Sequence, residues 1–152
     1  MTTHREGVFV EGLWVEKEGL SSDVAPPVPE VGCTSAPLES MSFHFASYCK
    51  AYSEDYMLCK NESQDPRHCL KEGRKVTRCA LDLIRKLKEN CDKEWTRHWE
   101  CLDVNNHQLF QCRKEEREFN DCVFKKLGLT KTIPDTPEGQ TPIHLKEKPL
   151  YK

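Results

Sequence analysis

Nine cysteines supply the thiol chemistry of this chain, and eight of them form a regular series between residues 49 and 122. The eight are Cys49, Cys59, Cys69, Cys79, Cys91, Cys101, Cys112 and Cys122. Taken in order as four pairs, they form four Cys-x9-Cys units, because nine residues separate the two cysteines of each pair. Thiols at fixed spacing can bind a metal, exchange electrons or form structural disulfides. Choosing among these uses requires knowing which elements position the sulfurs.

On an α-helix, a gap of nine residues places both sulfurs on one broad face, about 15 Å apart along the axis. Disulfide-bonded cysteines have Cα atoms within about 7 Å, so the two cysteines of one unit cannot bond each other. A crossed pairing of Cys49 with Cys69 needs parallel helices, which a short turn cannot supply. The spacing therefore predicts two antiparallel hairpins with nested disulfides, namely Cys49–Cys79, Cys59–Cys69, Cys91–Cys122 and Cys101–Cys112.

The same spacing disfavours metal and redox chemistry. Redox-active cysteines commonly stand as Cys-x-x-Cys, and paired zinc ligands are commonly separated by about two to four residues, whereas this chain has neither pattern. Adjacent cysteines that could hold copper(I) are also absent. A surface or partly buried side chain is the favoured interpretation of His98, rather than a metal ligand. With no glycine-rich phosphate loop, HExxH or GxSxG motif, we assign no catalytic, cofactor-binding or metal-binding residue and expect no enzyme.

Composition favours a small stapled helical domain in an oxidising compartment. Of 152 residues, 37% are hydrophobic and 32% charged, which suits one small core with tails and disulfides that compensate for its size. The formal net charge of −2 predicts no general affinity for nucleic acid. The first 30 residues are acidic and lack an apolar run, so we expect neither a secretory signal nor a presequence. We also expect no transmembrane span. Disulfides without either signal fit the mitochondrial intermembrane space.

Periodicity predicts an all-α fold of two tandem antiparallel hairpins, stapled by four disulfides, with extended tails at both ends. Phe45, Tyr48, Tyr52 and Tyr56 recur at three- and four-residue steps, which predicts a first helix from about Ser42 with these aromatics in the core. Asp65 is expected to cap the second helix, which ends near Asn90, and Gly128 to end the last one. The expected segments are an irregular docking segment and linker at 1–41, hairpins at 42–90 and 91–128, and a proline-rich tail at 129–152.

The two ends carry the candidate interface residues. Phe9, Leu13 and Trp14 belong to a short apolar cluster, which we interpret as a docking segment, with a strand or a loosely attached tail as alternatives. Cys33 lies in the irregular region without an evident partner, and we expect a free thiol there, with an intermolecular disulfide as the alternative. Candidate anchors in the carboxy-terminal tail are Ile133, Ile143, Leu145, Leu150 and Tyr151.

The doubled pattern resembles the twin Cys-x9-Cys (CHCH) family of the mitochondrial intermembrane space. Within that family, the chain is similar to the 19 kDa, PGIV-type accessory subunits of respiratory complex I, the NADH:ubiquinone oxidoreductase. The segments that carry the resemblance are Tyr56-Met57-Leu58-Cys59, residues 65–73, Cys79-Ala80-Leu81-Asp82, residues 99–103, Gln108-Leu109-Phe110 and Cys112-Arg113-Lys114. The resemblance covers about residues 45–128 and leaves both ends unmatched.

This resemblance implies a non-catalytic accessory subunit without a cofactor. It would lie on the intermembrane-space face of the membrane arm, peripheral to the inner membrane, among other complex I subunits. It also implies import as a reduced chain and oxidation by the resident disulfide-relay oxidoreductase. Tyr52, Tyr56 and Leu58, beside Cys59, are candidate contacts for that enzyme, although a core position is the favoured interpretation. A soluble assembly factor or metallochaperone of the same family, and a secreted binding module, stay open as alternatives.

Overall fold

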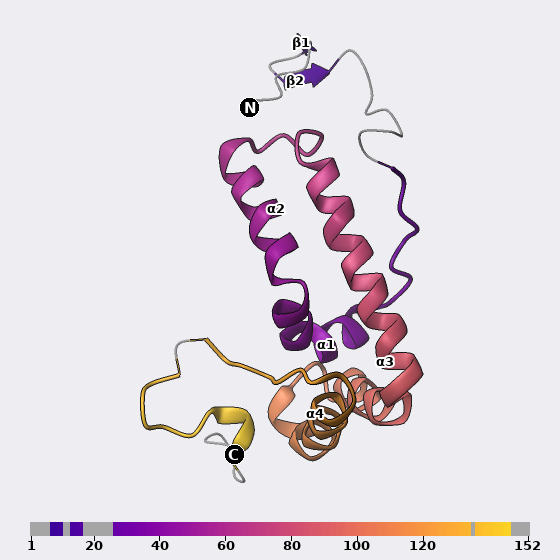
Figure 1. Cartoon of the computed structure of the whole chain (residues 1–152), viewed down its shortest axis with the longest axis vertical. Coiled ribbons are helices and arrows are strands. Elements are labelled where there is room, and N and C mark those ends of the chain that lie inside the picture. Colours follow the sequence, from indigo (N-terminus) through magenta and orange to yellow (C-terminus); the bar gives the residue numbers. More distant parts are fainter. Residues whose placement is uncertain (1–6, 11–12, 17–25, 135, 147–152) are drawn as a thin grey trace. The chain divides into compact units, whose positions relative to one another are not determined.

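A computed structural model of the chain describes residues 7–10, 13–16, 26–134 and 136–146; for 7–10 and 13–16 it describes the backbone alone. The elements in chain order are β1 (Gly7–Val10), β2 (Leu13–Glu16), α1 (Ser35–Tyr48), α2 (Lys50–Glu62), α3 (Leu70–Val104), the 3-10 helix η1 (Leu109–Cys112), α4 (Arg113–Leu127) and the 3-10 helix η2 (Ile143–Leu145) (Figure 1). The expected fold of disulfide-stapled helices is confirmed, with a short β-hairpin added near the amino terminus.

The chain divides into two compact units, which are described separately below. The first unit comprises residues 1–30 and 51–78, and the second comprises residues 31–50 and 79–152. The first therefore contains nearly all of α2 and the beginning of α3. The second contains α1, the rest of α3, and α4 with the segment that follows it.

The predicted start of the first helix near Ser42 is wrong, because α1 begins at Ser35. Pro37 lies in the first turn of α1, where the N–H that proline lacks would have no partner within the helix. In the sequence, Pro37 looks like part of the proline-rich linker before it. The prediction therefore placed the start of the first helix after this proline. The predicted helix is also interrupted at Cys49, whose backbone (φ −101°, ψ 18°) is not helical, and α2 resumes at Lys50.

Two other predicted boundaries agree with the structure. α3 has non-helical backbone at Cys91 (φ −135°, ψ 30°), so two helices meet there, next to the expected end at Asn90. α4 ends at Gly128, whose φ of 67° is in the left-handed region and whose N–H donates to the Phe124 carbonyl at 3.0 Å. Acidic residues in the first turn of α4 and Lys125 and Lys126 in its last turn also complement the helix dipole.

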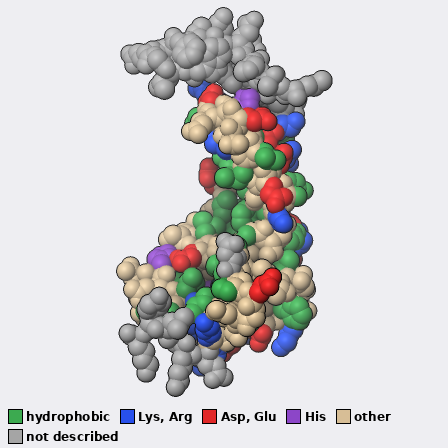
Figure 2. Space-filling model, turned by 90° about the vertical axis from the view of Figure 1, so that its left-hand side faces the viewer, with side chains coloured by type: hydrophobic (Ala, Val, Ile, Leu, Met, Phe, Trp, Pro, Cys, Tyr) green, Lys and Arg blue, Asp and Glu red, His purple; other side chains and the backbone are tan. Residues whose placement is uncertain are grey.

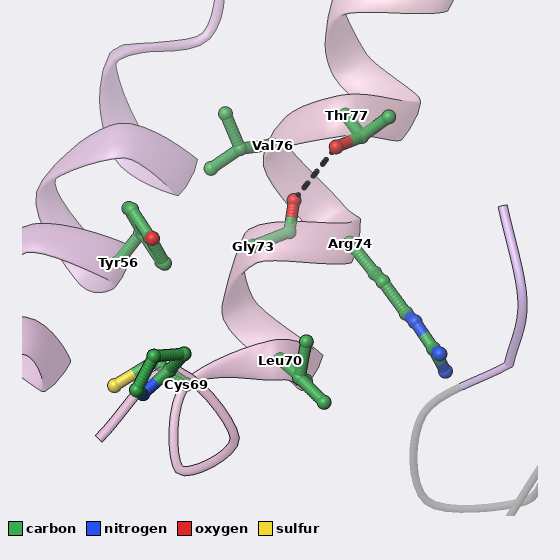
Figure 3. Close-up of a pocket in the computed structure, with 8 residues that line it drawn as sticks. Tyr56, Cys69, Leu70, Gly73, Arg74, Val76 and Thr77 are labelled. Carbon is green, nitrogen blue, oxygen red and sulfur yellow. Dashed lines mark hydrogen bonds between the residues drawn. The ribbon is translucent and has the colours of Figure 1, made fainter. Parts of the chain in front are cut away.

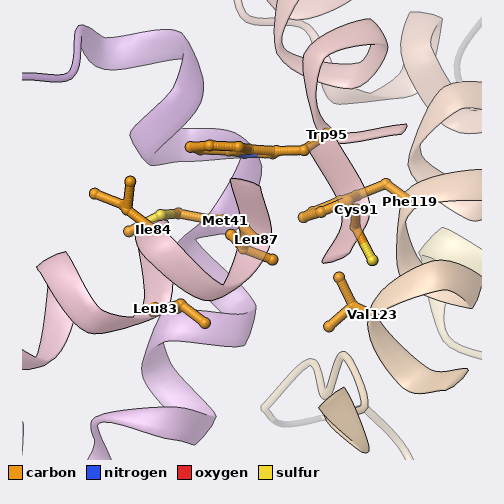
Figure 4. Packing of buried hydrophobic residues seen from close by; sticks show 8 residues of the cluster. All are labelled: Met41, Leu83, Ile84, Leu87, Cys91, Trp95, Phe119 and Val123. Atoms are coloured by element: carbon orange, nitrogen blue, oxygen red, sulfur yellow. The ribbon is translucent and has the colours of Figure 1, made fainter. Parts of the chain in front are cut away.

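The core of the second unit joins three helices. Its buried cluster comprises Met41, Leu83, Ile84, Leu87, Cys91, Trp95, Phe119 and Val123. Figure 4 shows these side chains facing one another from α1, α3 and α4. On α3, Leu83, Leu87, Cys91 and Trp95 recur every four residues with Ile84 beside them, as expected for one buried helical stripe. A smaller cluster of Ala36, Leu102 and Cys112 extends this packing toward the start of α1.

The first unit has no comparable core on α2, where no described side chain is buried. The expected aromatic core is correct for Phe45 and Tyr48, which pack against the buried cluster of the second unit. It is wrong for Tyr52 and for Leu58, which is 66% exposed. A helix with a single neighbouring helix has one covered stripe, and on α2 that stripe is occupied by Cys59 and by the half-buried Tyr56.

Near the amino terminus, β1 and β2 form a two-stranded antiparallel sheet in which Phe9 pairs with Trp14 and Val10 with Leu13. The backbone therefore adopts the strand alternative. The side chains of the candidate docking residues Phe9, Leu13 and Trp14 lie outside what the structure describes.

Candidate functional site

Four disulfides connect the helices in the nested order that the helical spacing predicts. They join Cys49 to Cys79, Cys59 to Cys69, Cys91 to Cys122 and Cys101 to Cys112. The paired Cα atoms lie 5.9–6.0 Å apart. Cys33 has a free thiol and packs against the main buried cluster. The eight series cysteines are therefore structural, and they hold neighbouring helices together.

The turn beside Cys59–Cys69 differs from its prediction. The Asp65 carboxylate accepts a hydrogen bond from the Arg67 N–H at 3.0 Å, as a capping residue does. However, α3 begins only at Leu70, so Asp65 caps a turn rather than the helix. The capping pattern at Asp65 therefore predicted the turn between α2 and α3 correctly. It placed the start of α3 about one helical turn too early.

In the first unit, α2 meets α3 at a glycine. The ring of Tyr56 lies over Gly73, where an added Cβ would stand 3.3 Å from the Tyr56 Cε2 atom (Figure 3). An open groove of about 360 Å³ lies beside this contact. The residues that line it with Tyr56 and Gly73 are Pro66, Cys69, Leu70, Arg74, Val76 and Thr77. The hydroxyl of Thr77 donates to the Gly73 carbonyl at 3.1 Å. Gly73 thus permits the close approach of the helices that the inner disulfide also requires.

The first unit also exposes large apolar side chains. Tyr52, Met57 and Leu58 of α2 are all exposed, and we call them the α2 apolar set. They lie near Cys59, as the candidate relay contacts were expected to do. Steps of five and six residues place Met57 about 140° and Leu58 about 120° around the helix from Tyr52, so these three exposed side chains lie on different sides of α2. The face shown in Figure 2 presents acidic and basic side chains interspersed with apolar ones.

The second unit buries a charged cluster that the sequence analysis missed. Glu116 is buried, and its two carboxylate oxygens accept hydrogen bonds from Arg113 and from Lys131. Burial alone would raise the pKa of Glu116, but these two donors hold it below its usual value. Burial lowers the pKa of Lys131. Glu116 belongs to a run of six charged residues at 113–118, a pattern typical of a solvated helix face, yet its side chain is buried.

A signal for that burial does exist in the sequence. Cys112, Glu116, Phe119 and Val123 follow one another at steps of four, three and four residues, which places Glu116 on the inward stripe of α4. No comparable signal marks Lys131, because it lies beyond the end of the helix and pairs across 15 residues of sequence.

Three buried histidines surround the same cluster. His98, expected at or near the surface, is buried, and its Nδ1 lies 2.7 Å from the Ser40 hydroxyl. His44 donates from Nε2 to the Asn120 side-chain oxygen at 2.9 Å, and His144, in η2 of the segment after α4, is also buried. Burial lowers the pKa of all three and brings that of His98 to about 4, so they are neutral at neutral pH. Among the described side chains, no His, Cys, Asp or Glu group of three is arranged to hold a metal ion.

A second polar contact joins α1 to α3. The Tyr48 hydroxyl donates to the Oδ2 atom of Asp82 at 2.5 Å, and the Lys86 ammonium lies 3.1 Å from the same oxygen and also donates to the Tyr48 hydroxyl. The hydrogen bond from Tyr48, followed by those from Arg85 and Lys86, holds the pKa of Asp82 well below its usual range. These groups satisfy one another, so they fix the two helices rather than present reactive atoms.

The described contacts join helices to one another, which is the geometry of a scaffold. No protein-family model matches the chain. In the ranges that the structure describes, no helix is both long and apolar enough to cross a bilayer.

Curated relatives share most of the chain. A protein of Neurospora crassa named NADH-ubiquinone oxidoreductase 20.8 kDa subunit is 47% identical over 131 residues, which are 85% of this chain and 72% of the relative. Two proteins of Arabidopsis thaliana, named NADH dehydrogenase (ubiquinone) 1 alpha subcomplex subunits 8-A and 8-B, are each 33% identical over 100 residues. These cover 65% of this chain and 89% and 91% of the relatives. The chain therefore belongs to the family of non-catalytic accessory subunits of NADH–ubiquinone oxidoreductase, the mitochondrial respiratory complex I.

Proposed function

We propose that this chain braces the membrane arm of complex I on its intermembrane-space face, as the counterpart of the 19 kDa, PGIV-type subunits. The observation that carries the proposal is the set of four nested disulfides in a member of a complex I family. Disulfides persist in oxidising compartments, and of the two sides of the inner membrane the intermembrane space is the oxidising one. The subunit is peripheral to the inner membrane and contributes no cofactor.

Bracing requires a rigid body and surfaces that bind neighbours. The buried cluster and the Glu116–Lys131 pair make the second unit rigid. The α2 apolar set supplies uncovered apolar area in the first unit. The candidate anchors Phe9, Leu13 and Trp14 extend these contacts at the amino terminus. Aromatic and large apolar anchors of this kind commonly dominate the energy of a protein interface.

Assembly begins with a reduced chain. The intermembrane-space disulfide-relay oxidoreductase oxidises it, and Tyr52 and Leu58 beside Cys59 guide that encounter. Both side chains are exposed in the folded unit, so packing in a core does not explain why these positions are apolar. Contact with another protein would explain it, and this supports the proposed role. The same side chains then become available to complex I subunits after oxidation.

Two measurements on mitochondria test the proposal. Protease added to mitoplasts, whose outer membrane is opened, should degrade the chain, whereas intact mitochondria should protect it. Native electrophoresis of solubilised membranes should show the chain co-migrating with NADH:ubiquinone activity. Protection in mitoplasts would contradict the proposed face of the membrane. A small free species would instead favour a soluble assembly factor or metallochaperone.

A further inference from the structure

The second unit contains a groove of about 350 Å³ between α4 and the segment that follows it. Four residues on one face of α4 line one side, and two short stretches of the following segment line the other. The lining residues are Arg117, Asn120, Asp121, Phe124, Leu129, Thr130, Lys131, Pro142, His144 and Leu145. On the α4 side, the groove runs from Arg117 to Phe124, which lie about 10 Å apart along the helix axis.

Two large apolar side chains of this lining are uncovered, one from each side of the groove. Phe124 of α4 is 60% exposed, and Leu145 of η2 is 55% exposed. Covering apolar area of this kind stabilises a contact roughly in proportion to the area removed from water. The occupant that fits the groove therefore supplies large side chains with apolar area.

The residues that follow η2 begin beside this groove. Lys146 has extended backbone (φ −71°, ψ 134°), and its carbonyl accepts a hydrogen bond from Arg117 at 2.6 Å. Residues 147–152 lie outside the described residues, and they start from this anchored point. Extended chain advances about 3.3 Å per residue, so position 150 can lie about 13 Å from Lys146. This reach exceeds the length of the groove along α4, so position 150 can reach Phe124.

Residues 147–152 also have the side chains that the groove requires. Leu150 and Tyr151 are adjacent, and Pro149 before them restricts Lys148 to extended backbone. A segment tethered beside its binding site has an effective concentration of about millimolar, so a weak apolar contact is enough to hold it there. A separate peptide or a second copy of the chain lacks this advantage.

We propose that residues 147–152 fold back along α4 and close this groove. Leu150 and Tyr151 then cover the exposed ring of Phe124, and Leu145 completes the contact from the opposite side. The contact shields an apolar edge of the second unit while the chain is free, and an uncovered edge of this kind favours association. The inference goes beyond the proposed function, because it concerns the chain by itself and does not depend on complex I.

Hydroxyl-radical footprinting of the oxidised full chain tests the closure, because the oxidation rate of a side chain follows its exposure. Leu150→Ser/Tyr151→Ser should raise the oxidation rates of Phe124 and Leu145 about threefold, since a millimolar effective concentration keeps even a weak contact formed most of the time. Both substituted residues lie beyond the helices and the disulfides, so the variant should retain four disulfides, counted by mass after alkylation.

Two controls separate closure from a general change. Lys148→Ser/Lys152→Ser alters the same segment but keeps its apolar side chains, so it should leave the oxidation rate of Phe124 at the wild-type value. Val104 is an internal reference, since it is 84% exposed in the same unit and does not line the groove. Its oxidation rate should be the same in all three proteins.

A photo-crosslinker at position 151 identifies what this segment contacts. Tyr151→p-benzoylphenylalanine should crosslink to the groove lining of the same chain, with a yield that does not change on dilution. Crosslinks between two copies that fade on dilution would overturn the proposal in favour of a second copy. Crosslinks formed only with another subunit, in assembled complex I, would assign the segment to that partner instead. Unchanged oxidation of Phe124 and Leu145 in Leu150→Ser/Tyr151→Ser would also overturn it.

Discussion

The two units share one cysteine spacing but differ in what stabilises them. In the second unit, Leu83, Phe119 and Val123 are fully buried and a buried ion pair ties α4 to the following segment. In the first unit, α2 buries no side chain, and the Cys59–Cys69 disulfide and the Tyr56–Gly73 contact connect it to α3. Identical staples therefore do not imply equal cores. The second unit therefore has a core of its own, whereas α2 leaves Tyr52, Met57 and Leu58 exposed.

The largest expected effect contrasts the ion pairs of the two units. Lys131→Met leaves Glu116 buried without one of its two donors and should lower the free energy of unfolding by about 3–5 kcal/mol. Lys75→Met removes the partner of Asp55 in the first unit, at 3.6 Å on the surface, and should cost about 0–1 kcal/mol. Urea unfolding followed by circular dichroism measures both. Equal losses would show that burial does not distinguish the two pairs.

A matched pair of leucines sharpens the contrast in apolar packing. Leu83→Ala in the core of the second unit should cost about 2–5 kcal/mol through lost burial and a residual cavity. Leu58→Ala on α2 should change the stability of the free chain by no more than about 0.5 kcal/mol. The same variant should weaken co-migration with complex I, whereas Leu83→Ala should act through folding. A large loss of stability from Leu58→Ala would place α2 in a core.

Acid should destabilise the second unit through its buried histidines. His98 has a pKa of about 4 when folded and an ordinary value near 6.5 when unfolded, so the unfolded chain binds the extra proton between these values. Its contribution is complete above pH 6.5 and is lost as the pH falls toward 4, amounting to about 2 kcal/mol by pH 5. Urea unfolding at pH 7.5 and 5.0 measures this. His98→Leu should reduce the pH difference by that amount, and an unchanged difference would contradict the assignment.

The smallest effect compares the outer and inner disulfides of the first hairpin. Cys49–Cys79 closes 30 residues and Cys59–Cys69 closes 10, so chain entropy favours the outer one by about 1 kcal/mol. The outer cysteines are also buried in the second unit. Thermal melting should therefore show a larger loss for Cys49→Ser/Cys79→Ser than for Cys59→Ser/Cys69→Ser. The reverse order would mean that α2 depends on its staple more than the core depends on the outer disulfide.

The contrast also explains which features could be predicted from the sequence. The nested pairing followed from the cysteine positions because helix geometry and disulfide distance together leave one arrangement. The burial of Tyr52 and Leu58 was predicted wrongly, because three- and four-residue spacing identifies a stripe without showing whether another helix covers it. The pairing of Lys131 with Glu116 depends on the path of the chain after Gly128, which no local pattern specifies. Pro37 concealed the start of α1 for a different reason, since it is acceptable in a first turn.

Hydrogen–deuterium exchange tests the central difference most directly, because it measures the local opening of each helix. In the isolated oxidised chain, amides of α4 and of residues 83–102 should exchange slowly, and amides of α2 should exchange much faster. In the assembled complex, α2 should become protected while the core helices change little. Slow exchange of α2 in the isolated chain, or fast exchange of α2 within complex I, would contradict the account.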